Sequence, residues 1–182
     1  MATIRLERTE DAAAAEAIVA DAFGPGRFAK SAYRLREGVT QIAALSFVAE
    51  HEGRIVGTVR YWPVDIGGTP ALMLGPIAII ASMQGQGIAL ALMQTSLDAA
   101  RKLGHRAVVL VGDEPYYGRA GFARIKPARR ITMPGPVDYG RLLGLGLVEG
   151  ALDAMAGEIR KAGLDEGVAA PGCALGAPQA HS

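Results

Sequence analysis

A glycine-rich segment near the middle of the chain has the composition of an anion-binding turn. The residues Gln84-Gly85-Gln86-Gly87-Ile88-Ala89 follow an apolar stretch and open directly into a helical pattern. Glycines let the backbone approach a ligand closely, and the free N–H groups and dipole of a helix start favour negative charge. The segment therefore predicts a site for a phosphate-bearing ligand.

The residues around this turn argue against two common classes of phosphate-binding motif. A P-loop requires Lys-Ser or Lys-Thr after the glycines, and Ile88-Ala89 in that place excludes it. A dinucleotide-binding fingerprint requires Gly or Ala at the position of Leu90. It also requires an acidic residue at the end of the next strand, and Asp113, which follows Val111-Gly112, matches that position only weakly. A glycine turn that merely reverses the chain stays open as a structural alternative.

The elements that must position the turn alternate between strand and helix patterns. Alternating or β-branched runs predict strands over 4–7, 45–50, 54–63, 72–80, 105–111 and 124–131. Helices are predicted after an N-cap at Thr9 up to about Phe23, over 28–37 and over 89–103; residues 144–148 are a last strand or the start of a final helix. This order predicts a mixed sheet with helices on its faces, an α/β (α+β) fold.

Two motifs together resemble a known family. The pattern Gln84-x-x-Gly87-x-Ala89 is similar to the Q/R-x-x-G-x-G/A motif of the GCN5-related N-acetyltransferases, the GNAT superfamily, and Tyr117-x-x-x-Gly121-Phe122 resembles its Y-x-x-x-G-F segment. The runs LGPIAI at 74–79, GDEPYYGRAGF at 112–122 and PGPVD at 134–138 resemble the YhbS-like branch of bacterial acetyltransferases. The resemblance spans 4–152.

The resemblance implies a fold, a co-substrate and a reaction. It implies a mixed sheet that splays between its fourth and fifth strands, with acetyl-CoA in the cleft. Main-chain groups of Ile77, Ala78 and Ile79 would hold the pantetheine arm, and those of Gln84, Gly85, Gln86, Gly87, Ile88 and Ala89 the pyrophosphate. The implied function is N-acetyl (acyl) transfer to a primary amine of a small-molecule or peptide acceptor.

The resemblance also implies catalytic roles. Tyr117 would be the general acid for the departing thiolate, since a phenol with a pKa near 10 is protonated at neutral pH. The structural alternative for Tyr117 is an aromatic ring packed beside Phe122. No general base is assigned. Strand 72–80 carries no carboxylate, and the strand before it offers only Asp65 near its end. Glu50, His51 and Glu114 are typical of solvent-facing positions.

The acceptor side would be built by the 28–37 segment and nearby loops. Arg34 and Arg36 in this segment could recognise a carboxylate or phosphate on the acceptor. A solvated helix face is the more common role for such residues, and the sequence leaves both open.

Composition sets further bounds. The 182 residues predict one domain over 1–162 and a flexible Gly-, Ala- and Pro-rich tail over 163–182. A net charge of +1 gives no footprint for nucleic acid, and no apolar stretch predicts a signal peptide or membrane span. A single cysteine, Cys173, favours a reducing, cytoplasmic setting, and three scattered histidines predict no metal site.

Two other classes of function stay open at this level. One is a non-catalytic module that binds acyl-CoA, since no base is visible. The other is a component that docks a protein partner through 142–148, and self-association as a homodimer is left open as well.

Overall fold

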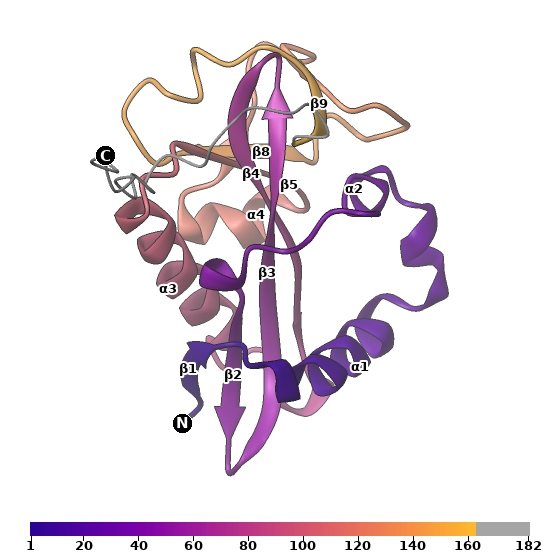
Figure 1. The fold of residues 1–182 in the computed structure, drawn as a ribbon, viewed down its shortest axis with the longest axis vertical. Coiled ribbons are helices and arrows are strands. Elements are labelled where there is room, and N and C mark those ends of the chain that lie inside the picture. The colour runs from indigo at the N-terminus through magenta and orange to yellow at the C-terminus, as the bar shows by residue number, and fades with distance from the viewer. Residues whose placement is uncertain (163–182) are drawn as a thin grey trace, which may run out of the picture.

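A nine-stranded mixed sheet forms the centre of the protein (Figure 1). The structure, a computed structural model, describes residues 1–162. The main path of the sheet is β1-β2-β3-β4-β5-β8-β6, and β9 pairs with β3 and β7. The strands are β1 Thr3–Leu6, β2 Phe47–His51, β3 Arg54–Ile66, β4 Thr69–Ile79, β5 Ala107–Val111, β6 Ala123–Arg124, β7 Ile131–Thr132, β8 Leu142–Gly146 and β9 Gly157–Lys161.

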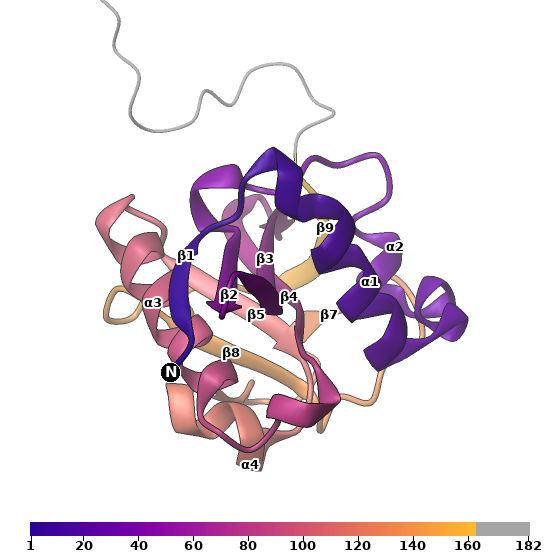
Figure 2. The ribbon, with the colours of Figure 1, turned by 90° about the horizontal axis from the view of Figure 1, so that it is seen from below.

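The two longer helices cover opposite faces of the sheet, as Figure 2 shows. Successive residues of a strand point to opposite faces. In β4, Ala78 packs against residues of α1 (Ala12–Phe23), whereas Ile77 and Ile79 share a core cluster with residues of α3 (Ile88–Lys102). The amphipathic pattern of α3 therefore buries one face of the sheet, and α1 covers the other.

The sheet splays between β4 and β5, as the resemblance implies. These strands are parallel and pair only at Leu72 with Val108 and at Met73 with Val109. Farther along, β4 stays with β3 as far as Ile79, while β5 follows β8. Within residues 1–162, the edge of β4 from 74–79 that faces β5 has no strand partner, so its backbone groups are open to a ligand.

A β-bulge lies at the point where the two strands separate. Val59 of β3 pairs with Ile77, and Tyr61 pairs with Leu74, so one residue of β3 faces both Gly75 and Pro76. The Trp62 indole Nε1 donates a hydrogen bond of 2.6 Å to the Gly75 carbonyl oxygen. A bulge bends and twists its strand, and here the indole fixes the bent segment on the side of α2 (Ser31–Arg34).

The single helix expected over 28–37 is wrong. A 3-10 turn at Pro25–Ala29 is followed by α2, only four residues long. Lys30 between them has extended backbone angles, φ −74° and ψ 139°, which interrupt any continuous helix. The first helix also begins differently: Thr9–Asp11 form a 3-10 turn, and α1 starts after Asp11 rather than after a Thr9 cap.

The strand expected over 124–131 is wrong as well. It is replaced by the two-residue strands β6 and β7, which pair with different partners. Pro127 between them has no backbone N–H and cannot donate to a ladder. The open question at 144–148 is resolved as strand β8, and β9 is an element that the residue pattern did not predict.

The membrane and tail predictions have different outcomes. Across residues 1–162, no helix combines the length and apolarity needed to cross a bilayer. The flexible tail predicted for 163–182 lies outside the described residues.

Candidate active site

Two cavities meet along the splayed strands. The larger has a volume of about 500 Å³ and the smaller about 470 Å³. Both are lined by Phe23 of α1, Ile77 of β4 and Tyr116 of α4 (Glu114–Tyr117). The two therefore form one continuous cleft with β4 as its floor.

The glycine-rich turn and the start of α3 shape the smaller cavity. Gly85 and Gly87 have φ values of 75° and 80°, in the left-handed region that favours glycine. Gly87 is the N-cap of α3, and the bond that closes the first helical turn runs from Ala91 N to Gly87 O at 3.0 Å. The amide groups of 88–90 consequently have no acceptor within the helix and are available to an anion.

Nearly all residues predicted for the donor come together in this cavity. Its lining includes Ile77, Ala78, Ile79, Gln84, Gly85, Gly87, Ile88 and Ala89. The side chains of Ile88 and Ala89 are buried in the core, so their contribution to the cavity is main-chain. Gln84 Nε2 donates to the Ile79 carbonyl oxygen at 3.3 Å, which ties the turn to the end of β4. Gln86 is exposed and is not part of the lining.

Reasoning from the sequence missed a cation beside this turn. Arg119 lies across the smaller cavity, in the 3-10 turn Gly118–Ala120 that follows α4. Its Nε donates to the Tyr116 carbonyl oxygen at 3.2 Å, and its guanidinium lies 4.8 Å from the Tyr116 ring centroid. The arginine within the YYGR motif was the signal that could have pointed to it.

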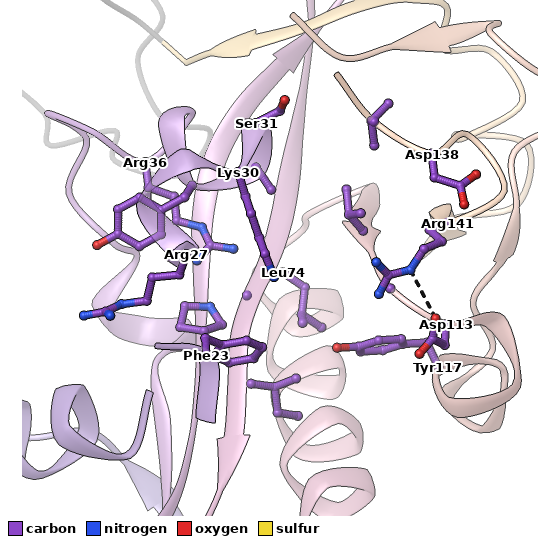
Figure 3. A pocket seen from close by; sticks show the side chains of 18 of the residues that line it. Phe23, Arg27, Lys30, Ser31, Arg36, Leu74, Asp113, Tyr117, Asp138 and Arg141 are labelled. Atoms are coloured by element: carbon purple, nitrogen blue, oxygen red, sulfur yellow. Dashed lines mark hydrogen bonds and ion pairs between the residues drawn. The ribbon is translucent and has the colours of Figure 1, made fainter. Parts of the chain in front are cut away.

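Tyr117 lies in the larger cavity with its hydroxyl directed across the cleft toward β4 (Figure 3). Its ring makes edge-to-face contacts with Tyr116 and Phe122, at centroid distances of 5.0 and 6.3 Å. Within residues 1–162 the hydroxyl has no hydrogen-bond partner. Burial, with smaller effects of Tyr116 and Asp113, raises the pKa of Tyr117 to about 12. The ring is thus packed beside Phe122, as the structural alternative to a catalytic role expected. The protonated hydroxyl nevertheless remains free to donate a hydrogen bond.

Charged side chains around the larger cavity are mostly cationic. Its lining contains the cations Arg27, Lys30, Arg36 and Arg141 and the carboxylates Asp113 and Asp138 (Figure 3). Arg141 Nε is 3.1 Å from Asp113 Oδ1, and Asp138 Oδ1 accepts a hydrogen bond of 2.8 Å from Gly140 N. The cavity therefore favours a ligand with negative charge.

The carboxylates considered earlier as bases have other partners. Glu50 pairs with Arg5 at 2.7 Å, and Glu114 pairs with Arg124 at 2.8 Å. Asp65 Oδ1 accepts a hydrogen bond from Gly68 N. None of the three lines either cavity. In the part of the chain that the structure describes, no three His, Cys, Asp or Glu side chains gather as metal ligands.

The segment considered as a docking site for a partner is an interior strand. β8 pairs with β5 along its whole length and with β6 at its outer side. Leu142 and Leu143 are 1% and 0% exposed, because their side chains pack in the core. Residues 142–144 are therefore not available to a partner, whereas Val148, beyond the end of the strand, is 46% exposed.

Comparison with known proteins gives the class to which this fold and cleft belong. The model of the acetyltransferase (GNAT) family matches residues 13–124, and the chain belongs to that family. The matched region contains α1 except its first residue, the bulged strand, the glycine-rich turn and Tyr117.

Within the family, the chain is similar to YhbS proteins. It is 35% identical over 122 residues to the uncharacterized N-acetyltransferase YhbS of Escherichia coli K12, covering 65% of this chain and 72% of that protein. The crystal structure of E. coli YhbS in complex with CoA matches with a TM-score of 0.73 and 30% identity, over 88% of this chain and 89% of that one. A GNAT acetyltransferase from Brucella melitensis in complex with acetyl-CoA matches with a TM-score of 0.65 and 28% identity, over 88% and 95%. The YhbS-like resemblance is confirmed.

Proposed function

We propose that the protein transfers an acetyl group from acetyl-CoA to a primary amine. One observation carries the proposal: the unpaired edge of β4 runs from the amide-lined start of α3 to the Tyr117 hydroxyl. A ligand that follows this edge meets an anion site at one end and a proton donor at the other. Two structural relatives hold CoA or acetyl-CoA, whose shape fits such a path.

The smaller cavity would take the pyrophosphate and the pantetheine arm. The free amides of 88–90 and the backbone of Gly85 and Gly87 supply hydrogen-bond donors without any side chain in the way, because nothing lies within 4 Å of a Cβ built on either glycine. Arg119 adds a positive charge at the rim. The backbone of Ile77–Ile79 would pair with the amide groups of pantetheine as a strand does.

The larger cavity would hold the acceptor and the reacting atoms. The acceptor nitrogen, in its neutral form, attacks the thioester carbonyl carbon, so a C–N bond forms and the C–S bond breaks. The nitrogen loses one proton and the sulfur gains one. Tyr117 is assigned as the donor to the sulfur, since its raised pKa keeps the phenol protonated at neutral pH. Main-chain N–H groups of β4 are the candidate donors to the carbonyl oxygen.

The experiment that tests this proposal has two readouts on the same preparation. Isothermal titration calorimetry measures acetyl-CoA binding, and release of free thiol is followed with amino acids, carboxamides, polyamines and a lysine peptide as acceptors. We expect binding together with acceptor-dependent thiol release. Binding without release for any acceptor supports the non-catalytic acyl-CoA module instead, and absence of binding overturns the donor assignment.

A further inference from the structure

Arg36 occupies a distinctive place in the larger cavity. It follows α2, and its guanidinium carbon lies 5.7 Å from the Tyr33 ring centroid and 5.9 Å from that of Trp62. A Cβ built on Gly75 would be 2.6 Å from Arg36 Nη2. The guanidinium therefore lies near two aromatic rings and against the bulge of β4, where the two strands separate.

This partly buried cation has no anionic partner in the part of the chain that the structure describes. No carboxylate within residues 1–162 pairs with Arg36, and its Nε is buried without a hydrogen-bond acceptor. Burial is the largest cause that lowers the pKa of Arg36 to about 10. By contrast, the buried Arg60 has its charge matched by Glu7 at 2.7 Å and Glu16 at 3.3 Å. Withdrawing part of a charge from water without a partner costs free energy, and an anionic ligand at Arg36 would offset that cost.

The remaining carboxylates of the cavity are already engaged. Asp113 pairs with Arg141, and Asp138 accepts from the Gly140 amide. The anion that completes Arg36 must therefore come from outside these groups. Arg36 lines the same cavity as Tyr117, and its guanidinium lies against Gly75 on the β4 edge that Tyr117 faces, so that anion would lie close to the reacting atoms.

We propose that Arg36 binds a carboxylate of the acceptor, and that the acceptor is a small amine of the amino-acid class. This inference rests on the proposed function. A planar guanidinium that lies near two rings offers its edge to a carboxylate in a bidentate pair. The single charge of a carboxylate pairs with this one guanidinium without drawing on the other cations of the cavity, Arg27, Lys30 and Arg141. The nearness of Arg36 to the reaction centre requires a short link between amine and carboxylate, which favours a free amino acid over an internal residue of a protein.

The test compares acceptors that differ only in the anion. Initial rates of thiol release are measured with the twenty amino acids, their carboxamides and the matching aminophosphonates at saturating acetyl-CoA. We expect at least one amino acid to be preferred over its carboxamide by roughly 10- to 100-fold in kcat/KM, as for a charge-assisted hydrogen-bonded pair. In Arg36→Met this preference should disappear, with little change for the carboxamide. Arg36→Lys keeps the positive charge but loses the bidentate geometry of the guanidinium, so it should retain only part of the preference for the amino acid.

Arg34→Met is the matched control, since Arg34 is exposed and does not line the cavity. It should keep the wild-type preference. Calorimetry with acetyl-CoA should give the same Kd for all variants, and thermal unfolding checks that each is folded. If Arg36→Met does not fold, Arg36→Lys decides the question, because the wild-type comparison alone does not separate Arg36 from the other cations of the cavity. An undiminished preference in Arg36→Lys would then count against the inference.

Several results would overturn the inference while leaving the proposed function standing. They are equal rates for amino acids and carboxamides, a preference for the phosphonates, or a loss of acetyl-CoA affinity as the main effect of Arg36→Met. The proposed function fails by a different result, which is the absence of thiol release with every amine in the panel.

Discussion

The Tyr117 ring packs directly against the backbone of Gly112. A Cβ built on Gly112 would lie 2.2 Å from Tyr117 Cε2 and 2.8 Å from Cδ2, so only glycine lets the ring lie where it does. Gly112 follows β5 directly and donates a backbone hydrogen bond of 2.9 Å to Arg141 O. The end of β5 thus sets the direction of the hydroxyl across the cleft.

Gly112→Ala should lower kcat while leaving acetyl-CoA binding largely intact. The added methyl group displaces the Tyr117 ring, and overpacking of this kind costs roughly 1–3 kcal/mol of stability. Steady-state kinetics, calorimetry and thermal unfolding measure the three quantities. Gly118→Ala is the control, because nothing lies within 4 Å of its Cβ and its φ of −58° suits alanine. Similar kinetics for both variants would contradict the role of Gly112.

Tyr117→Phe should lower kcat by roughly 10²- to 10⁴-fold, the range for loss of a general acid. The ring contacts with Tyr116 and Phe122 are kept, so stability and acetyl-CoA affinity should change little. Tyr139→Phe serves as control, since Tyr139 lines neither cavity. Unaltered turnover in Tyr117→Phe would leave the tyrosine with a packing role only.

The raised pKa of Tyr117 predicts the alkaline side of the pH profile. A phenol is an acid only below its pKa, and burial places that pKa at about 12 rather than near 10. The rate should rise with pH as the acceptor amine loses its proton, then stay level up to about pH 10, since the phenol remains protonated there. A fall in kcat between pH 8 and 9 in stopped-time assays would assign proton donation to a group with a lower pKa.

Gly87→Val should reduce acetyl-CoA affinity by more than about tenfold, or 1.4 kcal/mol. The side chain would project into the open space beside the amides of α3, and the φ of 80° adds strain. Gly104→Val is closely matched, because Gly104 follows the other end of α3 with a φ of 83° and open space around its Cβ. Calorimetry should show that both variants lose stability and only the first loses affinity.

Arg119→Gln should weaken acetyl-CoA binding by roughly twofold to tenfold, the range for a partly solvated charge contact. The effect should shrink at high salt, because an exposed charge is screened. Acetyl-pantetheine, which lacks the pyrophosphate, is the control ligand and should bind both proteins equally. Equal losses for the two ligands would place Arg119 against the pantetheine arm instead.

The sequence predicted those parts of the site that local chemistry defines. Gly85 and Gly87 need left-handed backbone angles, and the run before them is apolar, so the strand-turn-helix unit could be recognised from residue types alone. The predictions of helix and strand failed where one residue interrupts an otherwise regular pattern. The segment 28–37 has a helical composition, yet Lys30 is extended and divides it, and Pro127 divides the expected strand over 124–131.

The acceptor side of the cleft shows most clearly what only the tertiary structure decided. The sequence by itself predicted a mixed sheet with helices on its faces and an anion-binding glycine-rich turn. Its motifs also indicated an acetyltransferase family and Tyr117 as a candidate acid. It left Arg34 and Arg36 equivalent, two residues apart in one polar segment. In the fold, Arg34 is exposed, whereas Arg36 lies between Trp62 and the bulge at Gly75. The physical reason is that burial and the lack of a partner charge depend on strands β3 and β4, which are distant in sequence.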